Sequence, residues 1–297
     1  MKVLHDEQIE ITKEMVEILI TEQFPEYKNL PISEFDSTGT VNSIFRLGDD
    51  YCIRLPILES YAASILRESK ILPYLSKNLT IKIPQPIELG NPNSLYPFHW
   101  AIYNWIDGDC YDEKQITDKQ VIVSELATFI KELQVIGLLE NAPRAGRGPL
   151  AELNLMTIDA LTQSKDEIDY KMATKIWRRL INTTSWNQKP VWIHADLLKP
   201  NILTKENHIS GIIDFGSAGI GDPAFDIIPA WTVFDANNRM LFREELGICD
   251  EVWDRACAYA FHQAALIIPY YRESNPSFVK QAINTINEII IDEKGYR

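Results

Sequence analysis

The sequence has little cysteine and no long apolar run. Four cysteines lie far apart, without any C-x-x-C pair: Cys52, Cys110, Cys249 and Cys257. This pattern excludes a disulfide-stapled secreted scaffold and is typical of a reducing compartment. The longest apolar stretch, residues 256–268, contains His262 and Gln263 and is too short to span a bilayer. The first ten positions include three acidic residues, Asp6, Glu7 and Glu10, where a signal peptide would need an apolar core. We therefore expect a cytoplasmic protein without a membrane partner.

Positive charge is also scarce. The 297 residues include 29 Lys and Arg against 42 Asp and Glu, so the net charge is −13. Such a chain is a poor general binder of nucleic acid, because phosphate contacts need clustered cations. The same electrostatics favours cationic partners.

Several motifs of common enzyme classes are missing. The sequence contains no G-x-S-x-G, no H-E-x-x-H and no Walker A sequence, and its histidines and cysteines do not have zinc-ligand spacing. Apolar residues make up 45% and charged residues 24%, an ordinary globular composition. The length suggests roughly two domains of the usual ~100–200 residues.

The apolar pattern predicts a small sheet covered by helices, followed by a mainly helical part. The first part is expected to contain a helix capped by Thr12, a hairpin over 43–47 and 51–55, a helix over 60–75 and a strand over 98–103. From Asp118 a stripe of apolar residues predicts a long amphipathic helix. Later expected elements are a helix over 170–181, two short strands around residues 205–208, and helices after Pro223.

The residues that indicate chemistry lie in two short segments. His194-Ala-Asp196-Leu-Leu-Lys-Pro-Asn201 forms the first, and Asp214-Phe-Gly216 the second. An aspartate and an asparagine five residues apart on one loop can project into one cleft, and Asp214 follows a short apolar strand that can pair with the strand after Asn201. Oxygen ligands such as Asn201 and Asp214 suit Mg²⁺, which takes the rest of its shell from water and substrate phosphates. Asp196 can then accept a hydroxyl proton, as phosphoryl transfer requires.

These segments resemble the catalytic core of the protein-kinase-like superfamily, with H-x-D-x-x-x-x-N and D-F-G in order. More narrowly, residues 193–227 resemble the aminoglycoside phosphotransferase family, because Gly221-Asp-Pro-Ala-Phe-Asp226 follows. The resemblance implies an α+β, bilobal, protein-kinase-like fold. Its small β-rich N-terminal lobe would cover residues 1–103, and its larger, mainly helical C-terminal lobe residues 104–297.

The resemblance also implies transfer of the γ-phosphoryl group of ATP or GTP, with Mg²⁺, to a hydroxyl of a small molecule. Only seven residues separate Asp214 from Asp222, and no A-P-E sequence follows, so the chain lacks the long activation segment of a protein kinase. The implied nucleotide contacts are a phosphate-covering loop at Ser37, Thr38 and Gly39, then Arg54 with Glu68 as its ion-pair partner. The hinge residues Tyr103, Asn104, Trp105 and Ile106 would offer backbone groups to the base.

Several positions have a second interpretation. Arg54 stands where kinases usually have lysine, and its pair with Glu68 can be purely structural. His194 is interpreted as organising the loop instead of acting as an acid or base. Asp222 can bind an acceptor or cap the helix at Pro223, and Asp226 can touch substrate or bond the catalytic loop.

The acceptor and the activity also have alternatives. Residues 144–148 can grip phosphate or form an exposed, flexible loop. The resemblance and the acidity together favour a polycationic acceptor, an aminoglycoside-type antibiotic. The alternatives are a macrolide, an endogenous amino alcohol such as choline, or a kinase-shaped regulatory pseudokinase that binds nucleotide.

Overall fold

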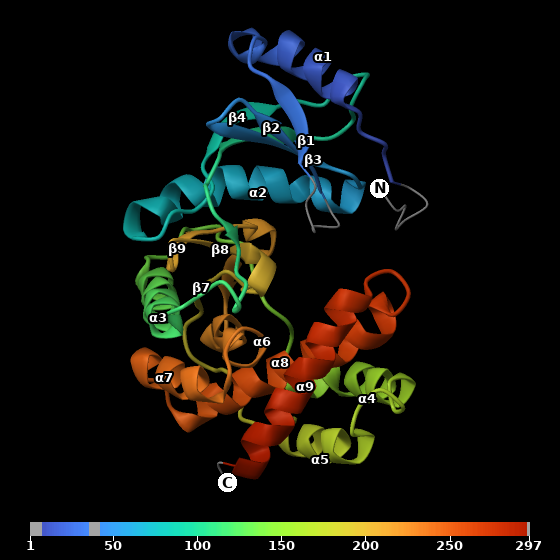
Figure 1. The fold of residues 1–297 in the computed structure, drawn as a ribbon, viewed down its shortest axis with the longest axis vertical. Coiled ribbons are helices and arrows are strands. Elements are labelled where there is room, and N and C mark those ends of the chain that lie inside the picture. The colour runs from blue at the N-terminus through green and yellow to red at the C-terminus, as the bar shows by residue number, and fades with distance from the viewer. Residues whose placement is uncertain (1–7, 36–41, 296–297) are drawn as a thin grey trace. The chain divides into compact units, whose positions relative to one another are not determined.

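The computed structural model describes residues 8–35 and 42–295, and the chain forms two compact units (Figure 1). Unit 1 consists of Met1–Asp109 together with Leu203–Lys205 and Ser210–Gly216. Unit 2 consists of Cys110–Ile202, Glu206–Ile209 and Ser217–Arg297. Two short pieces that follow the catalytic segment in sequence therefore belong to the unit formed by the first 109 residues.

Unit 1 is built on a five-stranded antiparallel sheet of order β1-β2-β3-β5-β4. Its strands are β1 Ile32–Phe35, β2 Asn42–Leu47, β3 Tyr51–Pro56, β4 Pro86–Gly90 and β5 Trp100–Asn104. Helix α1 (Lys13–Gln23) begins after Thr12, whose hydroxyl accepts the Met15 N–H at 3.3 Å. It packs its apolar face on the sheet side that carries Phe45 and Leu47.

Helix α2 (Glu59–Leu75) covers the opposite face of the same sheet (Figure 1). Side chains alternate between faces along a strand, so Ile53 and Leu55 of β3 point toward α1 while Arg54 points toward α2. Two 3₁₀ turns, Pro25–Tyr27 and Ser76–Asn78, follow the two helices. The sheet thus places Arg54 on the face that α2 covers.

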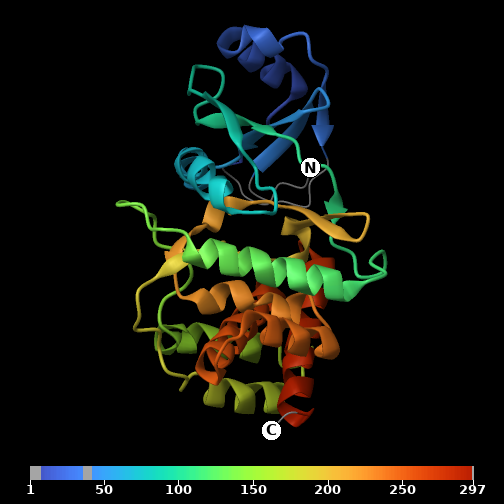
Figure 2. The ribbon, with the colours of Figure 1, turned by 90° about the vertical axis from the view of Figure 1, so that its left-hand side faces the viewer.

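Unit 2 is mainly helical. Its α-helices are α3 Lys119–Val135, α4 Asn154–Gln163, α5 Tyr170–Leu180, α6 Pro229–Thr232, α7 Ala236–Leu246, α8 Asp250–Tyr271 and α9 Pro276–Gly295. Asp118 caps α3 through the Gln120 N–H, and α3 lies beside α7 (Figure 2). The long helices α8 and α9 pack against each other. No helix in the described part of the chain is both long enough and apolar enough to cross a membrane.

Short strands flank the catalytic segment. They are β6 Asp109–Cys110, β7 Val191–Ile193, β8 Ile202–Lys205, β9 His208–Ile212 and β10 Gly219–Gly221. Strands β7 and β10 pair antiparallel, and β6, β8 and β9 form a sheet in that order with β8 in the middle. The catalytic segment therefore leaves one short strand and enters another through the 3₁₀ turn Lys199–Asn201.

The α+β architecture expected from the sequence is confirmed, and so are the predicted helices and the β2–β3 hairpin. The elements that were not predicted include β1, β4 and α4, as well as the short strands β6, β7 and β10. Strand β1 is four residues long with only Ile32 buried, and β4 starts at a proline and contains a register shift. Helix α4 exposes Leu155 and Met156, so its apolar residues do not follow one stripe.

Candidate active site

The loop that carries Asp196 is held by the carboxylate of Asp226. Asp226 accepts the backbone N–H of His194 at 2.7 Å and that of Ala195 at 2.8 Å. It is fully buried, and burial raises its pKa to about 7, although both backbone hydrogen bonds favour the ionised form. The predicted bond between Asp226 and the catalytic loop is therefore confirmed.

His194 organises the same loop from inside. Its ring is fully buried, and Nδ1 accepts the Asp196 N–H at 3.2 Å. Ala195 between them has φ +65°, a left-handed conformation that costs a residue with a Cβ about 1–2 kcal/mol. Fixed hydrogen bonds on both sides of Ala195 hold this turn, which turns the chain sharply just before Asp196.

Asn201 is oriented by hydrogen bonds to Asp196, the residue with which it is expected to act. Its Nδ2 donates to the Asp196 carbonyl at 2.9 Å and to Asp196 Oδ2 at 3.1 Å. Both bonds use the amide nitrogen, so the amide oxygen Oδ1 of Asn201 is left to accept a cation or a donor. The structure thus brings Asp196 and Asn201 together in unit 2, as their spacing predicts.

Asp222 has two internal partners. It caps the 3₁₀ turn Pro223–Ile227 through the Ala224 N–H at 3.0 Å. Arg255 of α8 binds the Asp222 carboxylate in a bidentate way, with Nε at 2.8 Å from Oδ2 and Nη2 at 3.3 Å from Oδ1. The predicted capping role is confirmed, whereas Arg255 gave no sequence signal because it lies 33 residues away in a helix.

In unit 1, a buried polar cluster surrounds Arg54. Its Nη1 donates to Glu68 Oε2 at 2.8 Å, its Nη2 lies 3.5 Å from Asp214 Oδ1, and the Tyr103 hydroxyl donates to Glu68 Oε2 at 2.9 Å. Burial opposes the charge on Arg54, but attraction by Glu68 outweighs it and raises the arginine pKa. Burial also raises the pKa of Glu68. The predicted Arg54–Glu68 ion pair is present; the bond from Tyr103 was not foreseen.

Asp214 is presented by a strained backbone and is the most accessible member of this cluster. Its φ is +65°, and its side chain is 39% exposed. The segment after it is fixed to α2, because Arg67 Nη1 donates to the Gly216 carbonyl at 3.0 Å. One carboxylate oxygen faces Arg54, which leaves the other for a ligand.

The hinge segment is only partly free to contact a base. The Asn104 N–H donates to the Gln85 carbonyl at 3.1 Å, and the Trp105 N–H donates to the Asp50 carbonyl at 2.7 Å. The Tyr103 hydroxyl is bonded to Glu68. Base contacts from residues 103–106 stay a prediction.

Two further segments, residues 37–39 and 144–148, are predicted to bind phosphate. Ser37, Thr38 and Gly39 lie outside the described residues. Residues 143–147 are fixed to β10, since Ala145 N donates to the Ile220 carbonyl at 3.1 Å and Ile220 N donates to the Pro143 carbonyl at 2.7 Å. Residues 144 and 146–148 are exposed, as expected, while the backbone at 143 and 145 is bonded to β10.

A comparison with protein families matches residues 34–261 to the model of the phosphotransferase enzyme family. This match covers well over half of the chain. The chain belongs to the phosphotransferase enzyme family. The resemblance found in its motifs is thereby confirmed, as is the expectation of an enzyme, a small-molecule kinase.

The chain is similar to one curated protein in sequence and to several solved structures in fold. The protein YcbJ of Bacillus subtilis (strain 168), which is uncharacterized, is 21% identical over 287 residues, 86% of this chain and 91% of YcbJ. A GDP complex of an aminoglycoside 2′-phosphotransferase-IIIa mutant has a TM-score of 0.75 at 19% identity, over 96% of this chain and 99% of that one. Macrolide 2′-phosphotransferase MphH from Brachybacterium faecium has a TM-score of 0.61 at 15% identity, over 91% and 98%. The kinase-like fold is therefore shared by enzymes named for two different acceptor classes.

Proposed function

We propose that this phosphotransferase moves the γ-phosphoryl group of ATP or GTP, with Mg²⁺, to a hydroxyl group of a small molecule. The observation that carries the proposal is the Asp196–Asn201 pair, in which Asn201 donates both N–H groups to Asp196 and keeps its oxygen for a cation. An aspartate that orients a hydroxyl and an amide oxygen that binds metal are the parts phosphoryl transfer needs.

The donor atoms fit Mg²⁺. This ion prefers oxygen ligands and commonly uses one or two protein side chains, with water and substrate phosphates completing its shell. Asn201 Oδ1 and the accessible carboxylate of Asp214 are such donors, and we assign them as the metal ligands. When bound, Mg²⁺ would neutralise charge on the β- and γ-phosphates during transfer.

The residues then have the following roles. Asp196 orients the acceptor hydroxyl and takes its proton as the hydroxyl oxygen bonds to the γ-phosphorus. The bond from this phosphorus to the β–γ bridging oxygen breaks, and the nucleoside diphosphate leaves with that oxygen. Arg54, fixed by Glu68, supplies positive charge toward the phosphates from the face of the unit 1 sheet that α2 covers.

The test is nucleotide turnover with and without acceptor. Release of ADP and of GDP is measured with Mg²⁺ across aminoglycosides, macrolides, amino alcohols and uncharged glycosides. We expect release to depend on an acceptor, and Asp196→Ala to lower turnover by orders of magnitude with nearly unchanged nucleotide affinity. Turnover that survives this substitution would contradict the role of Asp196. Nucleotide binding without any acceptor-dependent release would instead favour the regulatory pseudokinase.

The phosphoryl donor also indicates the compartment in which the enzyme works. Nucleoside triphosphates are cytoplasmic metabolites, and the four cysteines of the chain are all free thiols. We propose that the enzyme works in the cytoplasm.

A further inference from the structure

The segment that leads to Arg147 is fixed beside the start of the catalytic loop in unit 2. It runs along β10, since the Ala145 N–H donates to the Ile220 carbonyl at 3.1 Å. Strand β10 pairs with β7, the strand that enters the catalytic loop. A Cβ on Gly221 of β10 would lie 2.6 Å from the Ala145 carbonyl oxygen and 2.8 Å from Cδ1 of Ile193, the last residue of β7. The backbone two residues before Arg147 is therefore packed next to the end of β7.

The next residue packs toward helix α8. Gly146 has φ +82°, and a Cβ there would lie 2.8 Å from the ring of Phe225. Phe225 stacks on Tyr259 of α8, with ring centroids 4.0 Å apart, and its neighbour Asp226 holds the amides of the catalytic loop. Both sides of this contact are thus fixed, which places Arg147 at the catalytic loop and near α8.

The charge of Arg147 acts on both of these elements. Burial lowers the pKa of Arg147, and attraction by Asp196 offsets part of this effect. Burial also lowers the pKa of His262 on α8 to about 4, and the charge of Arg147 adds to this effect. Arg147 is still exposed to solvent, and it forms no ion pair with Asp196 in the described part of the chain. A guanidinium that is accessible and yet crowded by protein is well suited to bind an anion, because surrounding protein strengthens the attraction.

The neighbouring His262 adds no positive charge. The Thr157 hydroxyl donates to the Leu153 carbonyl at 2.8 Å, so it must accept its second bond, at 2.7 Å, from Nδ1–H of His262. The other ring nitrogen, Nε2, is then a bare acceptor, and it is buried without a hydrogen-bond partner among the described residues. The lowered pKa keeps this ring neutral, so the positive charge here is that of Arg147.

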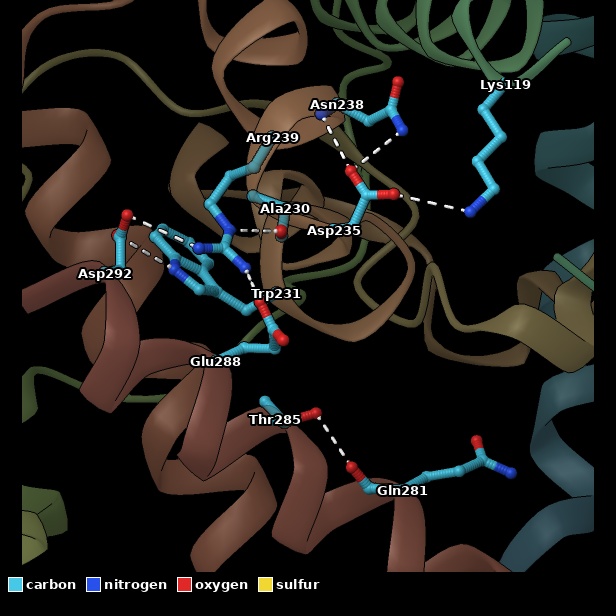
Figure 3. A network of polar contacts seen from close by, with 10 residues as sticks. All are labelled: Lys119, Ala230, Trp231, Asp235, Asn238, Arg239, Gln281, Thr285, Glu288 and Asp292. Carbon is cyan, nitrogen blue, oxygen red and sulfur yellow. Dashed lines mark hydrogen bonds and ion pairs between the residues drawn. The ribbon is translucent and has the colours of Figure 1, made fainter. Parts of the chain in front are cut away.

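Arg147 lacks the partners that hold another arginine of unit 2. The buried Arg239 donates to the Ala230 carbonyl at 2.8 Å. Its guanidinium also lies 2.5 Å from Glu288 and 3.4 Å from Asp292 of α9 (Figure 3). Arg147 makes no ion pair and no side-chain hydrogen bond with any residue that the structure describes. A crowded charge without a counter-ion is unfavourable, and an anion from a bound molecule would remove this cost.

We propose that Arg147 binds an anionic oxygen group, a phosphate or a carboxylate, next to the acceptor hydroxyl that Asp196 orients. A guanidinium binds either group through two parallel N–H···O bonds. The proposal rests on the phosphotransfer function proposed above. Two sources can supply the anion: the acceptor molecule itself, or the phosphoryl group during its transfer to the hydroxyl. With a polycationic acceptor the phosphoryl group is the source, because Arg147 would repel further positive charge.

The first test detects the anion site without turnover. Phenylglyoxal modifies accessible arginines, and tandem mass spectrometry of the full chain gives separate rates for Arg147 and for Arg144, an exposed arginine of the same segment. Rates in inorganic phosphate are compared with rates in chloride at equal ionic strength. We expect phosphate to slow the modification of Arg147 by about tenfold once it reaches ~ten times its Kd, and to leave Arg144 unchanged. No protection of Arg147, or equal protection of both arginines, would overturn the proposal.

Kinetics of the whole enzyme then identify the source of the anion. Hydroxy acids and sugar monophosphates join the acceptor panel, and Arg147→Gln is compared with the matched control Arg144→Gln. Loss of a charged hydrogen-bond partner costs about 10- to 100-fold. An anion on the acceptor predicts that Arg147→Gln raises the KM of anionic acceptors by this factor at constant kcat. An anion on the transferred phosphoryl group predicts that kcat falls by this factor with every acceptor at constant KM.

A merely structural Arg147 predicts neither pattern. Values of kcat and KM equal to those of Arg144→Gln would overturn the proposal. Arg147→Lys keeps the charge but loses the planar fork, so it should recover part of the loss, and no recovery would contradict recognition by charge. The protection experiment uses the unaltered chain and therefore tests the proposal even where a variant does not fold. Turnover that survives Asp196→Ala would contradict the phosphotransfer function instead, and protection of Arg147 by phosphate could still be measured.

Discussion

Removing the Glu68 carboxylate would test whether the cluster around Arg54 is structural or functional. Arg54 is 7% exposed and Glu68 is fully buried, so Glu68→Leu leaves a buried guanidinium whose remaining carboxylate partner among the described residues is Asp214, at 3.5 Å. The Tyr103 hydroxyl loses its acceptor at the same time. Breaking a buried ion pair costs about 3–5 kcal/mol. We expect a loss near the lower end, about 3 kcal/mol, because Asp214 remains as a partner.

Replacing both charges should restore most of this stability. Arg54→Met combined with Glu68→Leu removes the unpaired charge, and such apolar replacements are often neutral. The Tyr103 hydroxyl would still lack a partner, which costs about 1–3 kcal/mol. Adding Tyr103→Phe removes that cost as well. The triple variant should therefore be more stable than Glu68→Leu alone.

The assay is urea unfolding followed by tryptophan fluorescence and far-UV circular dichroism, since coincident curves are needed to assign one free energy. Nucleotide affinity is measured on each folded variant. A Glu68→Leu loss below about 1 kcal/mol, or a triple variant as unstable as the single one, would refute the reasoning. A stable triple variant with wild-type nucleotide affinity would make the Arg54–Glu68 pair purely structural. A stable variant that no longer binds nucleotide would support the phosphate-positioning role.

Three further predictions concern the catalytic loop and its support. Burial raises the pKa of Asp226 to about 7, so between about pH 4 and pH 7 the folded chain keeps a proton that the unfolded chain releases. The free energy of unfolding should therefore fall as pH rises through this range. In urea titrations, Asp226→Asn should lack this slope. Gly146→Ala should destabilise more than Gly247→Ala in the same assay, since both glycines have positive φ but a Cβ at Gly146 would lie 2.8 Å from the Phe225 ring; equal losses would contradict the close packing. Ala195→Gly should leave the melting temperature unchanged or raise it, by up to the equivalent of about 1 kcal/mol, and a clear drop would show that the left-handed turn is not strained.

The features that the sequence predicted have local signals. The Thr12 and Asp118 caps lie next to the helices they start, and the β2–β3 hairpin has its turn at residues 48–50. Asp222 caps a turn that begins one residue later. Each of these features can be predicted because cause and effect lie within a few residues of each other.

The features that were missed depend on contacts between distant residues. Arg255 reaches Asp222 across 33 residues and Tyr103 reaches Glu68 across 35. The preference for a polycation drew on the net charge of −13, a sum over all carboxylates that does not distinguish a free one from one bound to a buried arginine. Arg239 and Arg255 illustrate the difference, because each is buried and binds carboxylates that the sum counts as free.

The backbone around the active residues shows what these distant contacts achieve. Ala195 and Asp214 both have φ +65°, although neither is glycine, and strained residues persist only where surrounding contacts determine them. The Asp226 carboxylate bonds two successive amides at the first position, and Arg54 and Arg67 hold the second and the residues after it. Because these contacts set the backbone position of Asp196, for which the chemistry is proposed, replacing Asp226 should lower kcat far more than it changes nucleotide affinity.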